Sequence, residues 1–190
     1  MSYAVPTFVL FKKQKEILPK NTTTMKTFIE VLASELENES IGTRKMLALV
    51  PVEKGDWKPH AKNMAMKHLA THVAETAGWI ESVLTTEGID FAAMPYEPRS
   101  FETNGELLTF FDENVAKSKA QLLQTKDDAL DGTWTMRNGD VIFMQLSKYD
   151  TIRHSIGQMI HHRAQLGVYL RLLDIPIPGV YGPSADEMGA

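Results

Sequence analysis

The sequence of 190 residues contains no cysteine, and this absence removes several classes of chemistry. Disulfide bonds, thiolate nucleophiles and cysteine-based zinc sites all need the missing side chain. Neither a serine nucleophile elbow nor a glycine-rich phosphate loop occurs either. A metal site in this chain must therefore be built from histidine, aspartate, glutamate and glutamine.

Basic charge and long apolar runs are also scarce. The 20 Lys and Arg are outnumbered by 24 Asp and Glu, which gives a formal net charge of -4 and no wide basic surface. No apolar run approaches the roughly 18 residues needed to cross a bilayer. We therefore expect neither nucleic acid nor a membrane as a partner. Because residues 1–19 lack a small-residue cleavage site, we expect a cytoplasmic protein.

Apolar side chains recur at helical spacing in four segments. The segments are residues 23–49, 63–84, 104–125 and 149–173. Thr23 or Thr24 is the expected N-cap of the first helix. The pattern predicts an all-α fold.

Two regions depart from the helical pattern. Residues 133–146 alternate like strands around an Asn138-Gly139 turn, so a small hairpin or extended loop is expected before the last long helix. Residues 1–22 fit no periodic template and are expected to form an N-terminal extension. The remaining residues, 23–190, have the length of one domain.

Side chains that can bind a metal ion follow two of the predicted helices. Gln158 and His162 lie one turn apart at the edge of the apolar face of the last helix. His68, His72 and Glu75 lie along the flank of the second helix in the same way. If the two helices face each other, these side chains could hold a divalent cation between them.

Several motifs resemble the DinB (DinB/YfiT-like) superfamily of metalloenzymes, and the similarity extends from about Thr24 to Glu187. The motifs are WKPH at 57–60, LATHV at 69–73, HHRAQL at 161–166, VYLR at 168–171 and YGPSADE at 181–187. The resemblance implies an up-and-down four-helix bundle, often a homodimer, in which three histidines bind a divalent metal such as nickel or zinc. Characterised relatives include thiol-dependent S-transferases and a maleylpyruvate isomerase.

Carried over residue by residue, two of the implied ligands fall on His72 and His162. The third should lie four residues before His162, where this sequence has Gln158. A glutamine carbonyl is a weaker donor than a neutral imidazole, so the substitution should weaken the site. His68 or Glu75 is a possible further ligand.

Two hypotheses follow from this departure. In the first, His72, Gln158 and His162 hold nickel or zinc, and the cation activates water or a low-molecular-weight thiol for hydrolysis or S-transfer to a small electrophile. Glu75 would then be a base or a partner of the ligands. In the second, the protein is a non-catalytic bundle with a degraded metal site that binds a small ligand or a protein partner.

Overall fold

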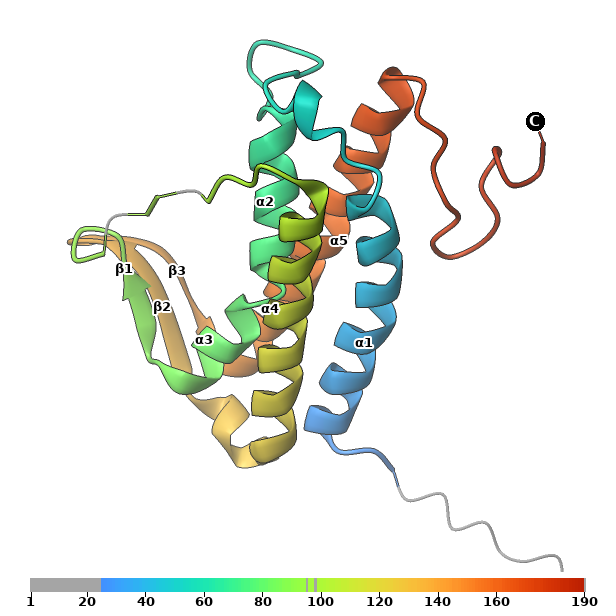
Figure 1. Ribbon diagram of the computed structural model, residues 1–190. Coiled ribbons are helices and arrows are strands. Elements are labelled where there is room, and N and C mark those ends of the chain that lie inside the picture. The colour runs from blue at the N-terminus through green and yellow to red at the C-terminus, as the bar shows by residue number, and fades with distance from the viewer. Residues whose placement is uncertain (1–24, 95, 98, 190) are drawn as a thin grey trace, which may run out of the picture.

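The computed structural model describes residues 25–94, 96–97 and 99–189, and in it long helices form a bundle with a small sheet at one side (Figure 1). The helices are α1 (Phe28–Leu47), α2 (Met66–Thr76), α3 (Trp79–Thr85), α4 (Asn104–Gln124) and α5 (Lys148–Leu172). The strands are β1 (Gly88–Asp90), β2 (Thr133–Asn138) and β3 (Val141–Ser147). Short 3-10 helices cover Val52–Lys54 and Asp127–Asp131. The predicted extension, residues 1–22, lies outside the described part of the chain.

Local hydrogen bonds fix where α1 begins. Thr27 caps the helix, because its hydroxyl accepts from the backbone N–H of Glu30 and the Glu30 carboxylate accepts from that of Thr27. The sequence had favoured Thr23 or Thr24, which lie outside the described residues; the helix starts at Phe28 instead. Periodicity alone does not distinguish one threonine from another as the cap.

The bundle does not follow the expected up-and-down order. Asn104 at the start of α4 donates to the carbonyl of Leu47 at the end of α1, at 2.8 Å, so these two helices are antiparallel. Ser155 in the first half of α5 donates to the carbonyl of Thr76 at the end of α2, at 2.6 Å, so this pair is antiparallel as well.

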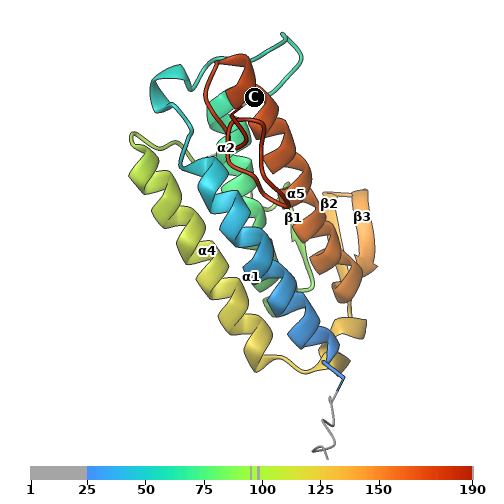
Figure 2. The same ribbon diagram turned by 90° about the vertical axis from the view of Figure 1, so that its right-hand side faces the viewer.

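Ion pairs between α1 and α5 complete the order of the helices. Arg153 of α5 pairs with Glu35 of α1, and Arg163, further along α5, pairs with Glu39, further along α1. The two helices therefore run in the same direction. α1 and α2 each pack against both α4 and α5, and the order is therefore up-down-down-up, with the consecutive helices α1 and α2 at opposite corners (Figure 2). The connection 48–65 crosses the end of the bundle, a path that helical periodicity does not encode.

The second predicted helix, 63–84, is broken at Gly78 into α2 and α3. A Cβ at Gly78 would lie 2.9 Å from the side chain of Asn114, so glycine allows α4 to approach the break. Ser118 serves the backbone groups freed there: its hydroxyl donates to the carbonyl of Ala77 at 2.6 Å and accepts from the N–H of Glu81 at 3.2 Å. Side chains of α4 thus replace the helical hydrogen bonds that the break removes.

Replacing Ser118 with alanine is expected to lower the free energy of unfolding by about 1–3 kcal/mol, because it leaves buried backbone groups without a partner. Ser118 is 0% exposed, so water does not substitute for the hydroxyl. Urea denaturation of the variant measures the change. Thr109→Ala is the matched control, because Thr109 is exposed on the same helix and donates only to the carbonyl of Gly105. Equal, small losses in both variants would contradict the role given to Ser118.

The predicted hairpin is confirmed, but a third strand makes a purely all-α description wrong. β2 and β3 pair antiparallel around the turn at Gly139, whose φ of 58° suits glycine. β1 pairs parallel to β2, and Gly88 lies so close to the backbone of Thr135 that a Cβ would not fit there. Three residues are too few to show an alternating pattern, so the sequence did not predict β1.

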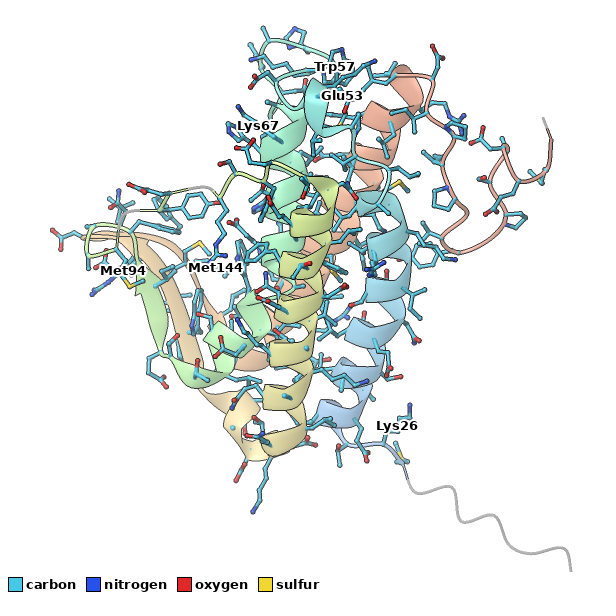
Figure 3. All side chains as sticks on the ribbon, in the orientation of Figure 1. Lys26, Glu53, Trp57, Lys67, Met94 and Met144 are labelled. Carbon is cyan, nitrogen blue, oxygen red and sulfur yellow. The ribbon has the colours of Figure 1, made fainter. Side chains whose placement is uncertain are left out.

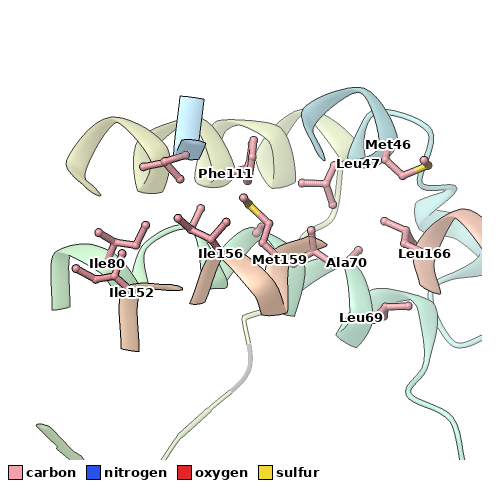
Figure 4. Close-up of a cluster of buried hydrophobic side chains, with 14 of the residues drawn as sticks. Met46, Leu47, Leu69, Ala70, Ile80, Phe111, Ile152, Ile156, Met159 and Leu166 are labelled. Carbon is pink, nitrogen blue, oxygen red and sulfur yellow. The ribbon is translucent and has the colours of Figure 1, made fainter. Parts of the chain in front are cut away.

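Apolar side chains from all the long helices meet inside the bundle (Figure 4). Leu36 of α1, Ile80 of α3, Phe111 of α4 and Met159 of α5 are among the fully buried ones. This core fixes the relative positions of α2 and α5, which carry the candidate ligands. No helix in the described part of the chain is long and apolar enough to span a bilayer.

The segment that follows α5 folds back onto the bundle (Figure 2). Asp186 accepts two hydrogen bonds from Arg171, and the hydroxyl of Tyr181 accepts one from Arg163 at 2.7 Å. The same hydroxyl donates to the carboxylate of Glu39 at 2.7 Å. Polar contacts therefore hold a segment that has too little apolar content to fold alone.

Candidate metal centre and adjoining cavity

The structure brings His72 of α2 and His162 of α5 into contact. The centroids of the two imidazole rings lie 4.6 Å apart, and the ring planes are inclined by 73°. Both side chains are half-buried on facing sides of adjacent, antiparallel helices. Two imidazoles at this separation can reach one ion between them.

Both imidazoles are held in the neutral form that binds metals. Burial, with a smaller contribution from the neighbouring His162, lowers the pKa of His72 to about 4. Burial also lowers the pKa of His162, although its hydrogen bond with Gln165 acts in the opposite direction. A neutral imidazole has a free nitrogen lone pair at physiological pH, as a metal ligand requires.

Gln165 orients the ring of His162. Its carbonyl oxygen, 2.7 Å from Nδ1, can only accept a hydrogen bond, so Nδ1 carries the proton. The lone pair is then left on Nε2. Fixing the tautomer of a ligand through its other nitrogen is typical of metal-binding histidines.

The lowered pKa of His72 makes the stability of the metal-free protein depend on pH. The pKa of a histidine in the unfolded chain is near 6.5, above the folded value of about 4, so the unfolded state binds a proton more readily. The stabilising contribution of His72 is complete above about pH 6.5 and is lost as the pH falls toward 4.

We expect the imidazole C2–H resonance of His72 in the metal-free protein to titrate with a midpoint at about pH 4 in an NMR titration. His72→Phe should reduce the loss of unfolding free energy between pH 6.5 and pH 4. A midpoint near the unperturbed value of about 6.5 would contradict the burial that the structure gives this ring.

Gln158, the third ligand expected from the sequence, has a weaker donor group than an imidazole. Gln158 lies one turn before His162 on α5 and is half-buried. Within residues 25–94, 96–97 and 99–189, no three His, Cys, Asp or Glu side chains are grouped so as to hold a metal ion. Two imidazoles and an amide oxygen still fit zinc or nickel, with lower affinity than three imidazoles.

The sequence left His68 and Glu75 open as further ligands. His68 is exposed on α2. Glu75 accepts a hydrogen bond from the hydroxyl of Tyr96 at 2.6 Å, and burial raises the pKa of its carboxyl group. His161 is exposed, although its ring centroid lies 4.9 Å from that of His162.

A cavity of about 250 Å³ adjoins His72 between the helices and the sheet. Its lining is largely apolar and comes from α2, α3, α5, the sheet and the segment after β1. The lining residues are His72, Glu75, Trp79, Ser82, Val83, Ile89, Phe91, Tyr96, Trp134, Met136, Met144 and Thr151. Figure 3 shows Met144 between the sheet and the helices.

Most of this lining could not be found from the sequence. Trp79 lies on the polar flank of its helix, but helical spacing does not show that it lines a cavity. Tyr96 lies in an irregular segment, and Trp134 and Met144 reach the cavity only because the hairpin packs against α5. The pairing of Glu75 with Tyr96 spans 21 residues and has no signal in local spacing.

The fold is an up-down-down-up helical bundle, and α2 and α5 each contribute one histidine of a pair that lies beside an apolar cavity. The protein is therefore a helical bundle with a candidate metal site between two of its helices. The chain matches the DinB family over residues 22–189 and belongs to that family. The resemblance stated from the motifs is thereby confirmed.

Three relatives set the chain in context. The uncharacterized protein YrdA of Bacillus subtilis is 24% identical over 155 residues, which cover 80% of this chain and 86% of YrdA. YfiT from Bacillus subtilis is described as a probable metal-dependent hydrolase with an unusual four-helix bundle topology. Its structure matches with a TM-score of 0.59 at 12% identity, and the match covers 87% of this chain and 95% of YfiT. The mycothiol-dependent maleylpyruvate isomerase has a TM-score of 0.52 at 15% identity, covering 75% of this chain and 64% of the isomerase. At these identities the structural likeness shows the fold.

Proposed function

We propose that this DinB-family protein is a metal-dependent enzyme in which His72, His162 and Gln158 hold a divalent cation, nickel or zinc. The observation that carries the proposal is the contact of two neutral imidazoles, 4.6 Å between ring centroids, on adjacent helices. The metal ions that bind imidazole well are those expected for such a donor set. With only two strong donors from the protein, coordination positions stay open for water or substrate.

A cation bound there would supply Lewis acidity, which lowers the pKa of a water or thiol. The residues of the chain do the rest. Gln165 keeps the Nε2 lone pair of His162 available, and the cavity beside His72 gives a substrate a largely apolar surface to pack on. Glu75 lines the same cavity, and burial raises the pKa of its carboxyl group, which favours a role in accepting and returning a proton.

The reaction we propose is hydrolysis of, or transfer of a thiol sulfur to, a small electrophile in the cavity. Support comes from what related structures are described as doing: one as a probable metal-dependent hydrolase, another as a mycothiol-dependent isomerase. Assays of the zinc- and nickel-loaded protein with small esters, and with a thiol plus a small electrophile, test the proposal. Turnover that chelators abolish and Glu75→Gln lowers would support it, and no turnover with either metal would count against it.

Replacing Gln158 with histidine is expected to raise zinc and nickel affinity by about tenfold or more, because an imidazole replaces a weak amide oxygen. Isothermal titration calorimetry against wild type measures the change. Gln124→His is the matched control, since it adds a histidine at the exposed end of α4, away from the pair. An affinity unchanged by Gln158→His would mean that position 158 does not face the ion.

A second candidate function rests on Gln158 itself, since one weak donor can abolish metal occupancy. The protein would then be a non-catalytic bundle that binds a small ligand or a protein partner. Metal content separates the two candidates. Near-stoichiometric zinc or nickel in untagged protein favours the enzyme, whereas protein whose thermal stability ignores both metals favours the non-catalytic bundle.

A further inference from the structure

The cavity beside His72 has a wall of aromatic and sulfur-containing side chains. Trp79, Phe91 and Trp134 line it together with Met136 and Met144. Aromatic and thioether groups contact planar apolar ligands well. At about 250 Å³ the cavity exceeds the roughly 150 Å³ of an engineered cavity that holds benzene, so a single substituted ring fits.

Most polar tips around the cavity are already hydrogen-bonded within the protein. The indole N–H of Trp134 donates to the hydroxyl of Thr86 at 3.0 Å, and the hydroxyl of Thr151 donates to the carbonyl of Ser147 at 2.8 Å. The hydroxyl of Tyr96 donates to Glu75. Of the seven lining side chains that carry a polar group, these four are bonded within the protein, and the rest of the lining is largely apolar, which favours apolar contact over hydrogen bonding.

The charge at the cavity disfavours anions. Glu75 is the only carboxylate among the described residues that line it, and none of these residues is Lys or Arg. Arg99 lies close enough to influence Glu75, but its guanidinium stacks over the ring of Phe110, 4.6 Å from the centroid. An anionic ligand would enter a largely apolar space beside a like charge and without a cationic partner.

We propose that this cavity binds an aromatic group of about one ring that carries no negative charge and excludes carboxylates, and that this group is the part of the substrate that positions the reacting atom beside His72. The inference rests on the proposed function for its link to catalysis, but the binding preference does not need a bound metal. A cavity with this binding preference would not take an acidic substrate.

Three planar probes of equal size test the preference: benzamide, benzoate and benzamidinium, which are neutral, negative and positive. The full chain is used at pH 8 with EDTA, in a Trp57→Phe background. Trp57 packs on Tyr169 at the end of α2 remote from α3, so its removal leaves Trp79 and Trp134, both in the cavity wall, as the fluorescent reporters. Binding is followed by indole fluorescence and by calorimetry.

Benzamide is expected to bind, and benzoate to bind at least about tenfold more weakly because of the charge of Glu75. Glu75→Gln should reduce that difference to less than about threefold, whereas the control Glu113→Gln, an exposed position on α4, should leave it unchanged. Ser82→Phe should fill the cavity and abolish the fluorescence response to benzamide, with circular dichroism verifying the fold.

Benzoate binding as tightly as benzamide would overturn the proposal, and so would benzamidinium binding more weakly than benzoate. A preference that survives Glu75→Gln unchanged would also overturn it, and this readout stands even where Ser82→Phe does not fold. Because EDTA is present throughout, the binding of the three probes does not depend on a bound metal. Zinc and nickel binding is measured separately, so either proposal can fail without the other.

Discussion

Arg163→Ala is expected to lower the free energy of unfolding by about 3–5 kcal/mol, a large share of the stability of a typical domain. The side chain is 3% exposed and pairs with the carboxylate of Glu39, 12% exposed, at 2.8 Å. It also donates to the hydroxyls of Thr43, at 3.1 Å, and Tyr181, at 2.7 Å. Its removal leaves a buried carboxylate uncompensated and releases the segment after α5 from the bundle.

Arg153→Ala is the matched control for this prediction. It removes the same charge from the same helix, but the Arg153 side chain is 44% exposed and its partner Glu35 is 29% exposed. Solvent screens such a pair, and the expected loss is below about 1 kcal/mol. Urea denaturation monitored by circular dichroism measures both variants. A loss from Arg163→Ala no larger than that from Arg153→Ala would contradict the role of the buried network.

His72→Ala is expected to weaken zinc and nickel binding by at least about 100-fold, because it removes one of only two imidazole donors. The variant should fold, since His72 is half-buried and no hydrogen bond of its side chain to the described residues is seen. Calorimetric titration of chelator-treated protein measures the affinity. His162→Ala should give a loss of similar size.

His68→Ala controls for nonspecific binding to surface histidines. His68 lies one turn before His72 on α2 but is exposed, so its removal should change the affinity by less than about threefold. If His68→Ala costs as much as His72→Ala, the ion is held at the outer face of α2. That result would replace the pair of His72 and His162 with a different site.

Helical periodicity was sufficient to predict the positions of the long helices but not how they are arranged. The predicted segments 104–125 and 149–173 agree with α4 and α5 to within a residue at each end. Direction and neighbourhood depend on contacts between distant residues, such as that of Asn104 with Leu47, and these leave no trace in local spacing. The up-and-down order was therefore wrong.

The break at Gly78 shows the same limit on a smaller scale. An apolar face continued across it, so the pattern predicted one helix. Only the packing of α4 makes the break favourable, because Ser118 bonds the freed backbone groups and Asn114 occupies the space beside the glycine. A glycine within a helical pattern signals a possible break, but its partner lies about 40 residues away.

The candidate ligands were chosen by residue type and family motif, and the cavity was not predicted. His72 and His162 could be named because imidazoles on two apolar-faced helices are few in this sequence. Gln165 follows His162 by three residues, but its bond to Nδ1 of His162 became visible only in three dimensions. The metal, its ligand set and the homodimer stay predictions.

X-ray absorption at the metal edge tests the central claim most directly, because it counts the imidazoles around the ion. Untagged protein is loaded with one equivalent of zinc or nickel, and the spectrum is compared with that of His72→Ala. We predict two imidazoles in the wild-type protein and one in the variant. A wild-type spectrum with no imidazole contribution, or one that His72→Ala leaves unchanged, would contradict metal binding by this pair.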